Sequence, residues 1–80
     1  MLEMLKTSNK LVGIKQCLKA LENGNVSHVF IAEDADERLL KGIKETCNAK
    51  SIELISVESK KVLGKACGIE VGSAVACVLK

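Results

Sequence analysis

The sequence contains no proline, no tryptophan and no tyrosine, and Phe30 is its one phenylalanine. Protein modules that read single-stranded nucleic acids stack the bases on several aromatic side chains, which this chain cannot supply. Because proline-rich, low-complexity and linker-like segments are also absent, nothing in the sequence marks a boundary between domains. The 80 residues, 48% of them hydrophobic, are enough for one small core. We therefore expect a single domain over residues 1–80.

Histidine is scarce, and its scarcity limits the chemistry open to the chain. A cysteine nucleophile needs a histidine partner, and zinc sites use cysteines in closely spaced pairs. His28 is the only histidine, and the cysteines are far apart in the sequence, at Cys17, Cys47, Cys67 and Cys77. We therefore expect free cysteines that pack as small hydrophobic side chains, with no metal, no cofactor and no enzymatic activity.

Long apolar segments are missing as well. No apolar run approaches the roughly 18 residues that a membrane-spanning helix needs. In residues 1–10, Glu3, Lys6 and Lys10 interrupt the hydrophobic residues, unlike the apolar core of a signal peptide. The sequence predicts a cytoplasmic protein without a membrane partner.

Charged residues are present in number but unevenly spread. The net charge is +2, yet residues 1–24 carry four Lys and two Glu, and residues 60–80 carry four Lys and one Glu. Residues 25–59 carry four basic and seven acidic groups. If the fold brings the two ends together, they form a positive surface that attracts a phosphate backbone.

Strand-like runs alternate with helical patterns along the chain. A short extended segment begins at Lys10, and continuous apolar runs predict buried strands over 26–32, 52–57 and 71–79, the first and last of them central. Strands that alternate with helices predict an α/β fold. We expect a three-layer α/β/α sandwich around a small mixed sheet of about four strands, with right-handed crossovers.

Three helices are expected between these strands. The first runs from about residue 13 to 23 and ends at Gly24. Carboxylates suit the N-cap and first turn of the second helix, and we prefer this interpretation of Glu33, Asp34 and Asp36 to a metal site or an acid/base pair. The third helix is capped by Ser56 or Ser59 and ends at Gly68. Side chains expected to face the core from the second and third helices are Leu39, Leu40, Ile43, Cys47, Val62, Leu63 and Ala66.

Three blocks of sequence carry a further signal: residues 13–21 (GIKQCLKAL), 29–36 (VFIAEDAD) and 63–71 (LGKACGIEV). In order and spacing they resemble the signature blocks of the ribosomal L-seven-Ae kink-turn-binding family, close to its bacterial ribosomal-protein-like branch. The resemblance extends from Leu11 to Leu79, and the third block is its most specific part. It implies a monomeric α/β/α protein that recognises and stabilises kink-turns in ribosomal RNA, riboswitches or similar RNAs, alone or within a ribosome or other ribonucleoprotein.

The first block has a physical interpretation of its own. A helix that starts at Gly13 offers unpaired backbone amides and the positive end of its dipole. Lys15, Gln16 and Lys19 share its exposed face and can donate to guanine and adenine edges. The resemblance implies that these residues, with Ile14, contact the tandem sheared G·A pairs of a kink-turn. On composition alone, an ordinary solvated helix face would be the commoner explanation of these residues.

The first block also departs from the family pattern. Archaeal and eukaryotic relatives usually carry Asn and Glu where this chain has Lys15 and Gln16. Glutamine cannot accept from two guanines as a carboxylate can, so affinity or base preference is expected to shift. Lys19 fits the pattern.

The third block contains a loop with branched apolar residues between glycines. The resemblance implies that Ile69 and Val71 form an apolar shelf for the unstacked nucleotides of the RNA bulge, with Glu70 between them. Lys65 would add phosphate contacts, as would its neighbours Lys60 and Lys61. In the alternative interpretation Ile69 and Val71 cover the core and Glu70 faces water. A protein-docking module of the same fold, without a specific RNA, is the alternative function.

Overall fold

The computed structural model describes residues 9–69 and 71–80 of the chain. In this part, strands and helices alternate in the order β1 (Lys10–Val12), α2 (Ile14–Glu22), β2 (Val26–Ala32), α3 (Glu37–Lys50), β3 (Glu53–Val57), α4 (Lys60–Ala66) and β4 (Val75–Leu79). The strands form one sheet in the order β1-β4-β2-β3. β4 is antiparallel to β1 and β2, whereas β2 and β3 are parallel. The predicted α/β fold with a mixed sheet of four strands is therefore confirmed.

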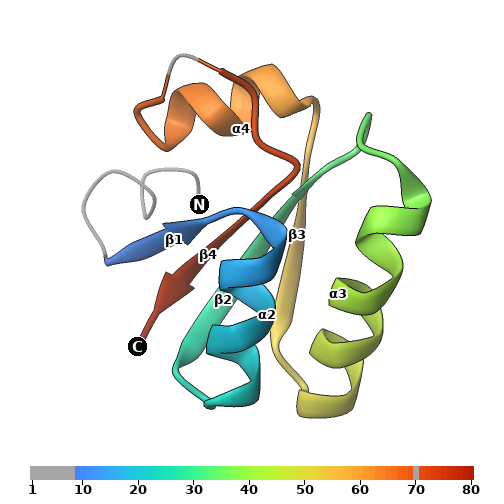
Figure 1. Cartoon of the computed structure of the whole chain (residues 1–80), viewed down its shortest axis with the longest axis vertical. Coiled ribbons are helices and arrows are strands. Elements are labelled where there is room, and N and C mark those ends of the chain that lie inside the picture. Colours follow the sequence, from blue (N-terminus) through green and yellow to red (C-terminus); the bar gives the residue numbers. More distant parts are fainter. Residues whose placement is uncertain (1–8, 70) are drawn as a thin grey trace.

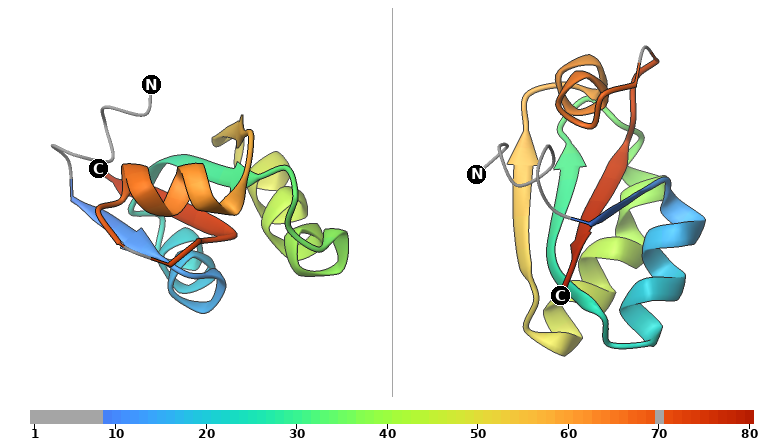
Figure 2. Two further views of the ribbon diagram at one scale, coloured as in Figure 1. Left: turned by 90° about the horizontal axis from the view of Figure 1, so that it is seen from above. Right: turned by 90° about the vertical axis from the view of Figure 1, so that its left-hand side faces the viewer.

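The helices lie in two places relative to this sheet. α2 and α3 pack side by side against one face, and α4 lies across the end of the sheet at which β4 begins (Figures 1 and 2). Among the described residues, α4 is the only helix that does not belong to the layer formed by α2 and α3.

The two central strands supply most of the core. β2 and β4 are apolar along almost their whole length, because both of their faces are covered, and the prediction that they are central is confirmed. Their fully buried side chains include Val26, Val29, Phe30, Val75 and Cys77. β3 differs from the expected buried strand, because it forms an edge of the sheet and leaves Glu53 and Ser56 exposed.

The prediction that the helix residues face the core is wrong for two of them. Leu39 is 52% exposed and Val62 is 36% exposed. Leu40, Ile43 and Cys47 already form the inward stripe of α3, so Leu39, one residue before Leu40, points about 100° away from that stripe. The same reason turns Val62 outward, since its neighbour Leu63 is the residue of α4 that is fully buried.

The last strand is shorter than predicted. β4 begins at Val75, and residues 71–74 form a loop instead of extending the strand. The backbone amide of Ser73 donates to the carbonyl of Lys60 at 3.0 Å, so it is turned toward α4 and not toward a neighbouring strand. This tertiary hydrogen bond turns Ser73 away from the sheet, and regular pairing of the strand starts only at Val75.

Of the three carboxylates after β2 that are expected to serve the second helix, Asp36 does so. Asp36 is the N-cap of α3, and its side chain accepts from the amide of Arg38 at 2.9 Å. The contact to Arg38 also lowers the pKa of the Asp36 carboxyl. Ser59, and not Ser56, caps α4 by accepting from Val62.

Asp34 has a role that its position before α3 does not predict. Its Oδ1 accepts from the amide of Lys60 at 2.7 Å, 26 residues further along the chain. The carboxylate therefore binds the first turn of α4 and not that of α3, and it joins the loop after β2 to the third helix.

The four cysteines are free and buried, as predicted. The Sγ of Cys17 lies 3.7 Å from the carbonyl oxygen of Leu11. Burial raises the pKa of the Cys47 and Cys67 thiols, and a hydrogen bond to Cys77, together with burial, raises that of Cys17. Raised values keep these thiols protonated and unreactive near neutral pH.

Candidate nucleic-acid interface

The first helix starts at a glycine whose conformation other residues rarely adopt. Gly13 has φ +112° and ψ +148°, and α2 begins at the next residue. In this conformation the Gly13 carbonyl accepts the first helical hydrogen bond from Cys17 at 3.0 Å, while its own amide donates to the Val75 carbonyl at 3.0 Å. The sequence correctly places a helix start here.

The exposed face of α2 carries the side chains that the sequence singled out. Lys15, Gln16 and Lys19 are exposed, whereas Cys17, Ala20 and Leu21 are buried on the opposite side of the helix. No acidic residue lies in the first turn of α2. The positive end of the helix dipole and the lysines therefore face solvent together.

The loop between α4 and β4 contains the second predicted segment. The amide of Ile69 donates to the Gly64 carbonyl at 3.0 Å, and its half-buried side chain packs against the core. Val71 is 72% exposed, so the alternative in which it covers the core is wrong for Val71 and fits Ile69. Glu70 lies outside the described residues.

The start of α2 and the loop are joined at the beginning of β4. Val75 accepts from Gly13, and Ser73, two residues earlier, is bonded to Lys60 at the start of α4. Both segments therefore lie at the same end of the sheet, as the right-hand view of Figure 2 shows. Blocks that are about 50 residues apart in the sequence thus form one surface in the fold.

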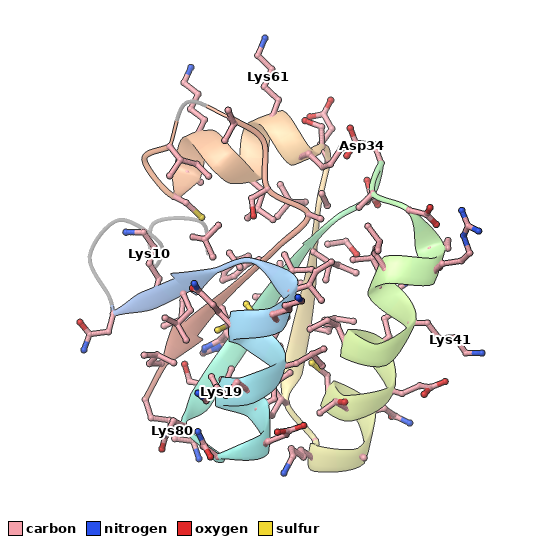
Figure 3. All side chains as sticks on the ribbon, in the orientation of Figure 1. Lys10, Lys19, Asp34, Lys41, Lys61 and Lys80 are labelled. Carbon is pink, nitrogen blue, oxygen red and sulfur yellow. The ribbon has the colours of Figure 1, made fainter. Side chains whose placement is uncertain are left out.

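Lysine side chains form two groups on the molecule. β1 pairs with β4, so the two basic ends of the chain do come together, with Lys10 opposite Val78. Figure 3 shows Lys10, Lys19 and Lys80 on one side of the molecule, around α2, β1 and the end of β4. Lys61 points outward from α4, where Lys65 is also exposed.

A hollow beside α2 adds residues that sequence reasoning missed. It has a volume of about 310 Å³ and is lined by Gln16 and Lys19 together with Asn23, Asn25 and Leu79. The two asparagines flank the glycine that ends α2, and such residues are ordinarily assigned to the turn itself. Their amide groups extend the polar surface from the helix face toward the end of β4.

His28 belongs to a different part of the sheet. Its Nε2 lies 3.2 Å from Glu53 on the neighbouring strand, and its Nδ1 lies 2.9 Å from the Ser27 hydroxyl. Within residues 9–69 and 71–80, no group of three or more His, Cys, Asp or Glu side chains is placed to hold a metal ion. In the same residues, no helix is long and apolar enough to span a membrane.

Comparison with known proteins identifies relatives along the whole chain. An RNA-binding protein of Caldanaerobacter subterraneus subsp. tengcongensis is 48% identical over 67 residues, which cover 84% of this chain and 82% of the relative. An RNA-binding protein of Halalkalibacterium halodurans is 43% identical over 75 residues, covering 94% and 92%. The solved structure of a 15.5kD RNA binding protein from Giardia lamblia superposes with a TM-score of 0.89 at 28% identity, covering 99% of this chain and 70% of that one.

The family pattern gives the same result. Residues 1–80 match the protein-family model that is described as "Ribosomal protein L7Ae/L30e/S12e/Gadd45 family". The resemblance inferred from the three sequence blocks is thereby confirmed, and so is the bacterial branch, because both bacterial relatives align over most of their length. This chain belongs to the ribosomal protein L7Ae/L30e/S12e/Gadd45 family.

Proposed function

We propose that the chain is a non-catalytic RNA-binding protein that recognises and stabilises kink-turns in a structured RNA. The hydrogen bond from Gly13 to Val75 is the observation that carries the proposal, because it holds the two predicted RNA segments at one end of the sheet. Relatives whose names describe RNA-binding proteins support it.

The first turn of α2 would read base edges. Its unpaired amides and the exposed side chains of Lys15, Gln16 and Lys19 donate hydrogen bonds, and the sheared G·A pairs of a kink-turn offer acceptors on guanine and adenine. α2 presents no carboxylate in its first turn, so these contacts are made without repulsion from the phosphates.

The loop after α4 would bind the bulged nucleotides. Val71 exposes 72% of its surface although it is apolar, and an exposed branched side chain beside basic residues suits the face of an unstacked base. Ile69, in the same loop, packs against the core. Lys65 lies on α4, where it would contact the phosphate backbone, and Glu70 belongs to the same loop in sequence.

The same proposal covers the biological context. Kink-turns occur in ribosomal RNA and in regulatory RNAs, so the protein would act as a monomer on such an RNA, within the ribosome or another ribonucleoprotein. Its place of action would then be the cytoplasm.

The test is a titration of two RNAs of equal length, one with a kink-turn and one plain duplex, each at two salt concentrations. Phosphate contacts alone bind both RNAs with similar salt dependence. We expect a preference for the kink-turn that persists at the higher salt concentration. Equal and weak binding of both RNAs would refute kink-turn recognition and favour the protein-docking function.

A matched pair of triple variants locates the surface. In the first, Lys15, Gln16 and Lys19 are replaced by alanine; in the second, the exposed α3 residues Lys41, Asn48 and Lys50 are replaced. Both remove two positive charges and one amide, so non-specific attraction falls equally. The proposal requires that only the α2 variant loses the kink-turn preference while both remain folded.

A further inference from the structure

The carbonyl of Val75 accepts two hydrogen bonds from different parts of the candidate interface. The backbone amide of Gly13 donates to it at 3.0 Å, and the hydroxyl of Ser73 donates to it at 2.8 Å. A carbonyl oxygen has two lone pairs, so both bonds can exist together. One buried atom therefore joins the start of α2 to the loop that carries Val71.

Ser73 is unusual among the described residues because it is the one buried polar side chain, with 5% exposure. A hydroxyl is costly to bury unless it is hydrogen-bonded. Alanine would fill nearly the same space, and it would leave no unpaired group behind, since Val75 would still accept from Gly13. Core stability alone does not explain a serine at this position.

The backbone of Ser73 is held from the other side. Its amide donates to the Lys60 carbonyl at 3.0 Å, and the Lys60 amide donates in turn to Asp34 at 2.7 Å. The next carbonyl, that of Ala74, accepts from Ala32 at 2.9 Å. The main chain of the loop is thus bonded to α4 and to β2. The Ser73 side chain adds a bond to the Val75 carbonyl, which also accepts from Gly13 at the start of α2.

We propose that Ser73 is a positioning residue of the RNA surface, whose hydroxyl sets the loop of residues 71–74 relative to the first turn of α2 through the shared Val75 carbonyl. The inference rests on the proposed function. Recognition of a bent RNA depends on the distance between two protein segments, because each contacts a different part of the bend. Binding groups must be held to within about 0.5 Å by supporting hydrogen bonds, and Ser73 provides that support without touching RNA.

The proposal distinguishes shape recognition from general attraction. Without the hydroxyl the loop keeps its bonds to Lys60 and β2, and Val75 keeps its bond to Gly13. Ser73 is then no longer bonded to the carbonyl that Gly13 contacts, so the loop is held less firmly relative to the first turn of α2. Contacts to a plain duplex do not need both segments in register. The kink-turn preference should therefore fall while duplex affinity stays the same.

The experiment measures dissociation constants of the full chain for the kink-turn RNA and the plain duplex, with melting temperatures of each protein. The variants are Ser73→Ala, Ser73→Thr and Ser73→Val. Threonine and valine have nearly the same shape, so their comparison isolates the hydroxyl from the added bulk. We expect the dissociation constant of Ser73→Ala for the kink-turn RNA to rise about tenfold, which corresponds to about 1.4 kcal/mol of binding free energy. Its dissociation constant for the plain duplex should not change. Threonine should bind the kink-turn more tightly than valine by a similar factor.

The outcomes separate the two proposals. If the wild type prefers the kink-turn and Ser73→Ala keeps that preference in full, the positioning role is wrong and the proposed function stands. An equal loss for both RNAs would also overturn it, since that is the result of a merely structural role. If the wild type shows no kink-turn preference, the proposed function fails and the inference fails with it. The alanine result decides the question even if the threonine and valine variants do not fold, because alanine introduces no new contact.

Discussion

The carbonyl oxygen of Val71 occupies the space that a β-carbon on Gly64 would need. The same β-carbon would lie 3.0 Å from the Cα of Gly72. Gly64 is buried in the middle of α4, where glycine weakens a helix, so its presence needs a packing reason. That reason is the close approach of the loop that carries Val71.

Replacement of Gly64 by alanine should destabilise the protein and displace the loop. Overpacking of this kind costs about 1–3 kcal/mol, which corresponds to a fall in melting temperature of about 4–8 °C per kcal/mol for a domain of this size. The matched control is Gly42→Ala on α3, where a β-carbon would meet nothing within 4 Å. That variant should be stabilised by up to about 1 kcal/mol. Thermal unfolding of both variants checks the prediction, and equal effects of the two substitutions would contradict it.

The fold could be predicted from the sequence where the pattern is local. The apolar run of β2 and the spacing of Leu40, Ile43 and Cys47 on α3 are read directly, because each element buries one face or two. The prediction for Leu39 is wrong because helical spacing gives the centre of the buried face of a helix but not its edge. The prediction of a strand over residues 71–74 is wrong although Val71 and Ala74 continue the apolar run of β4. The hydrogen bond from Ser73 to Lys60 turns this segment toward α4, and the sequence does not show that bond.

For the candidate site, too, the local features could be predicted from the sequence and the long-range contacts could not. Gly13 and the exposed face of α2 follow from helix rules and from the family resemblance. The contacts that join the two segments do not, because Gly13 and Val75, or Asp34 and Lys60, are brought together only by the sheet order and by the path of α4. Ser73 gave no signal, since a serine between a glycine and an alanine is ordinary in a loop.

Stability should decline at alkaline pH because of two buried thiols, those of Cys47 and Cys67. Burial raises the pKa of Cys47 and Cys67 in the folded protein, while in the unfolded chain a thiol ionises near about 8.5. Above that pH the unfolded chain releases protons that the folded protein retains, so the free energy of unfolding falls. The slope is about 1.4 kcal/mol per pH unit for each such thiol, and the contribution is fully present below pH about 8.5.

Urea unfolding under reducing conditions between pH 7 and 9.5 measures this decline. The variant Cys47→Ala should show a smaller slope above pH 8.5, by about one proton, even though its stability at pH 7 is lower. Comparison of slopes separates ionisation from packing. A free energy of unfolding that stays constant from pH 8 to 9.5 would show that the thiols ionise as easily in the folded protein as in the unfolded chain.

Lys19 and Lys65 should differ in what their removal does to RNA binding, although both are exposed lysines. Lys19 lies on the face of α2 proposed to read base edges, so Lys19→Ala should weaken kink-turn binding by about 1–3 kcal/mol and leave plain duplex binding nearly unchanged. Lys65 lies on α4 and is proposed to contact phosphates. Lys65→Ala should weaken the binding of both RNAs by a similar factor. It should also reduce the slope of log affinity against log salt concentration by about one.

Titrations of both RNAs at four salt concentrations separate the two roles, with Lys41→Ala on α3 as the control. Figure 3 shows Lys41 on the far side of the molecule from Lys19, so this variant loses the same charge without losing a proposed contact. If Lys19→Ala lowers the affinity for both RNAs equally, α2 attracts the phosphate backbone and reads no base. If Lys41→Ala matches Lys65→Ala, the effect of Lys65 is one of net charge, because a charge far from the RNA then acts as strongly as one beside it.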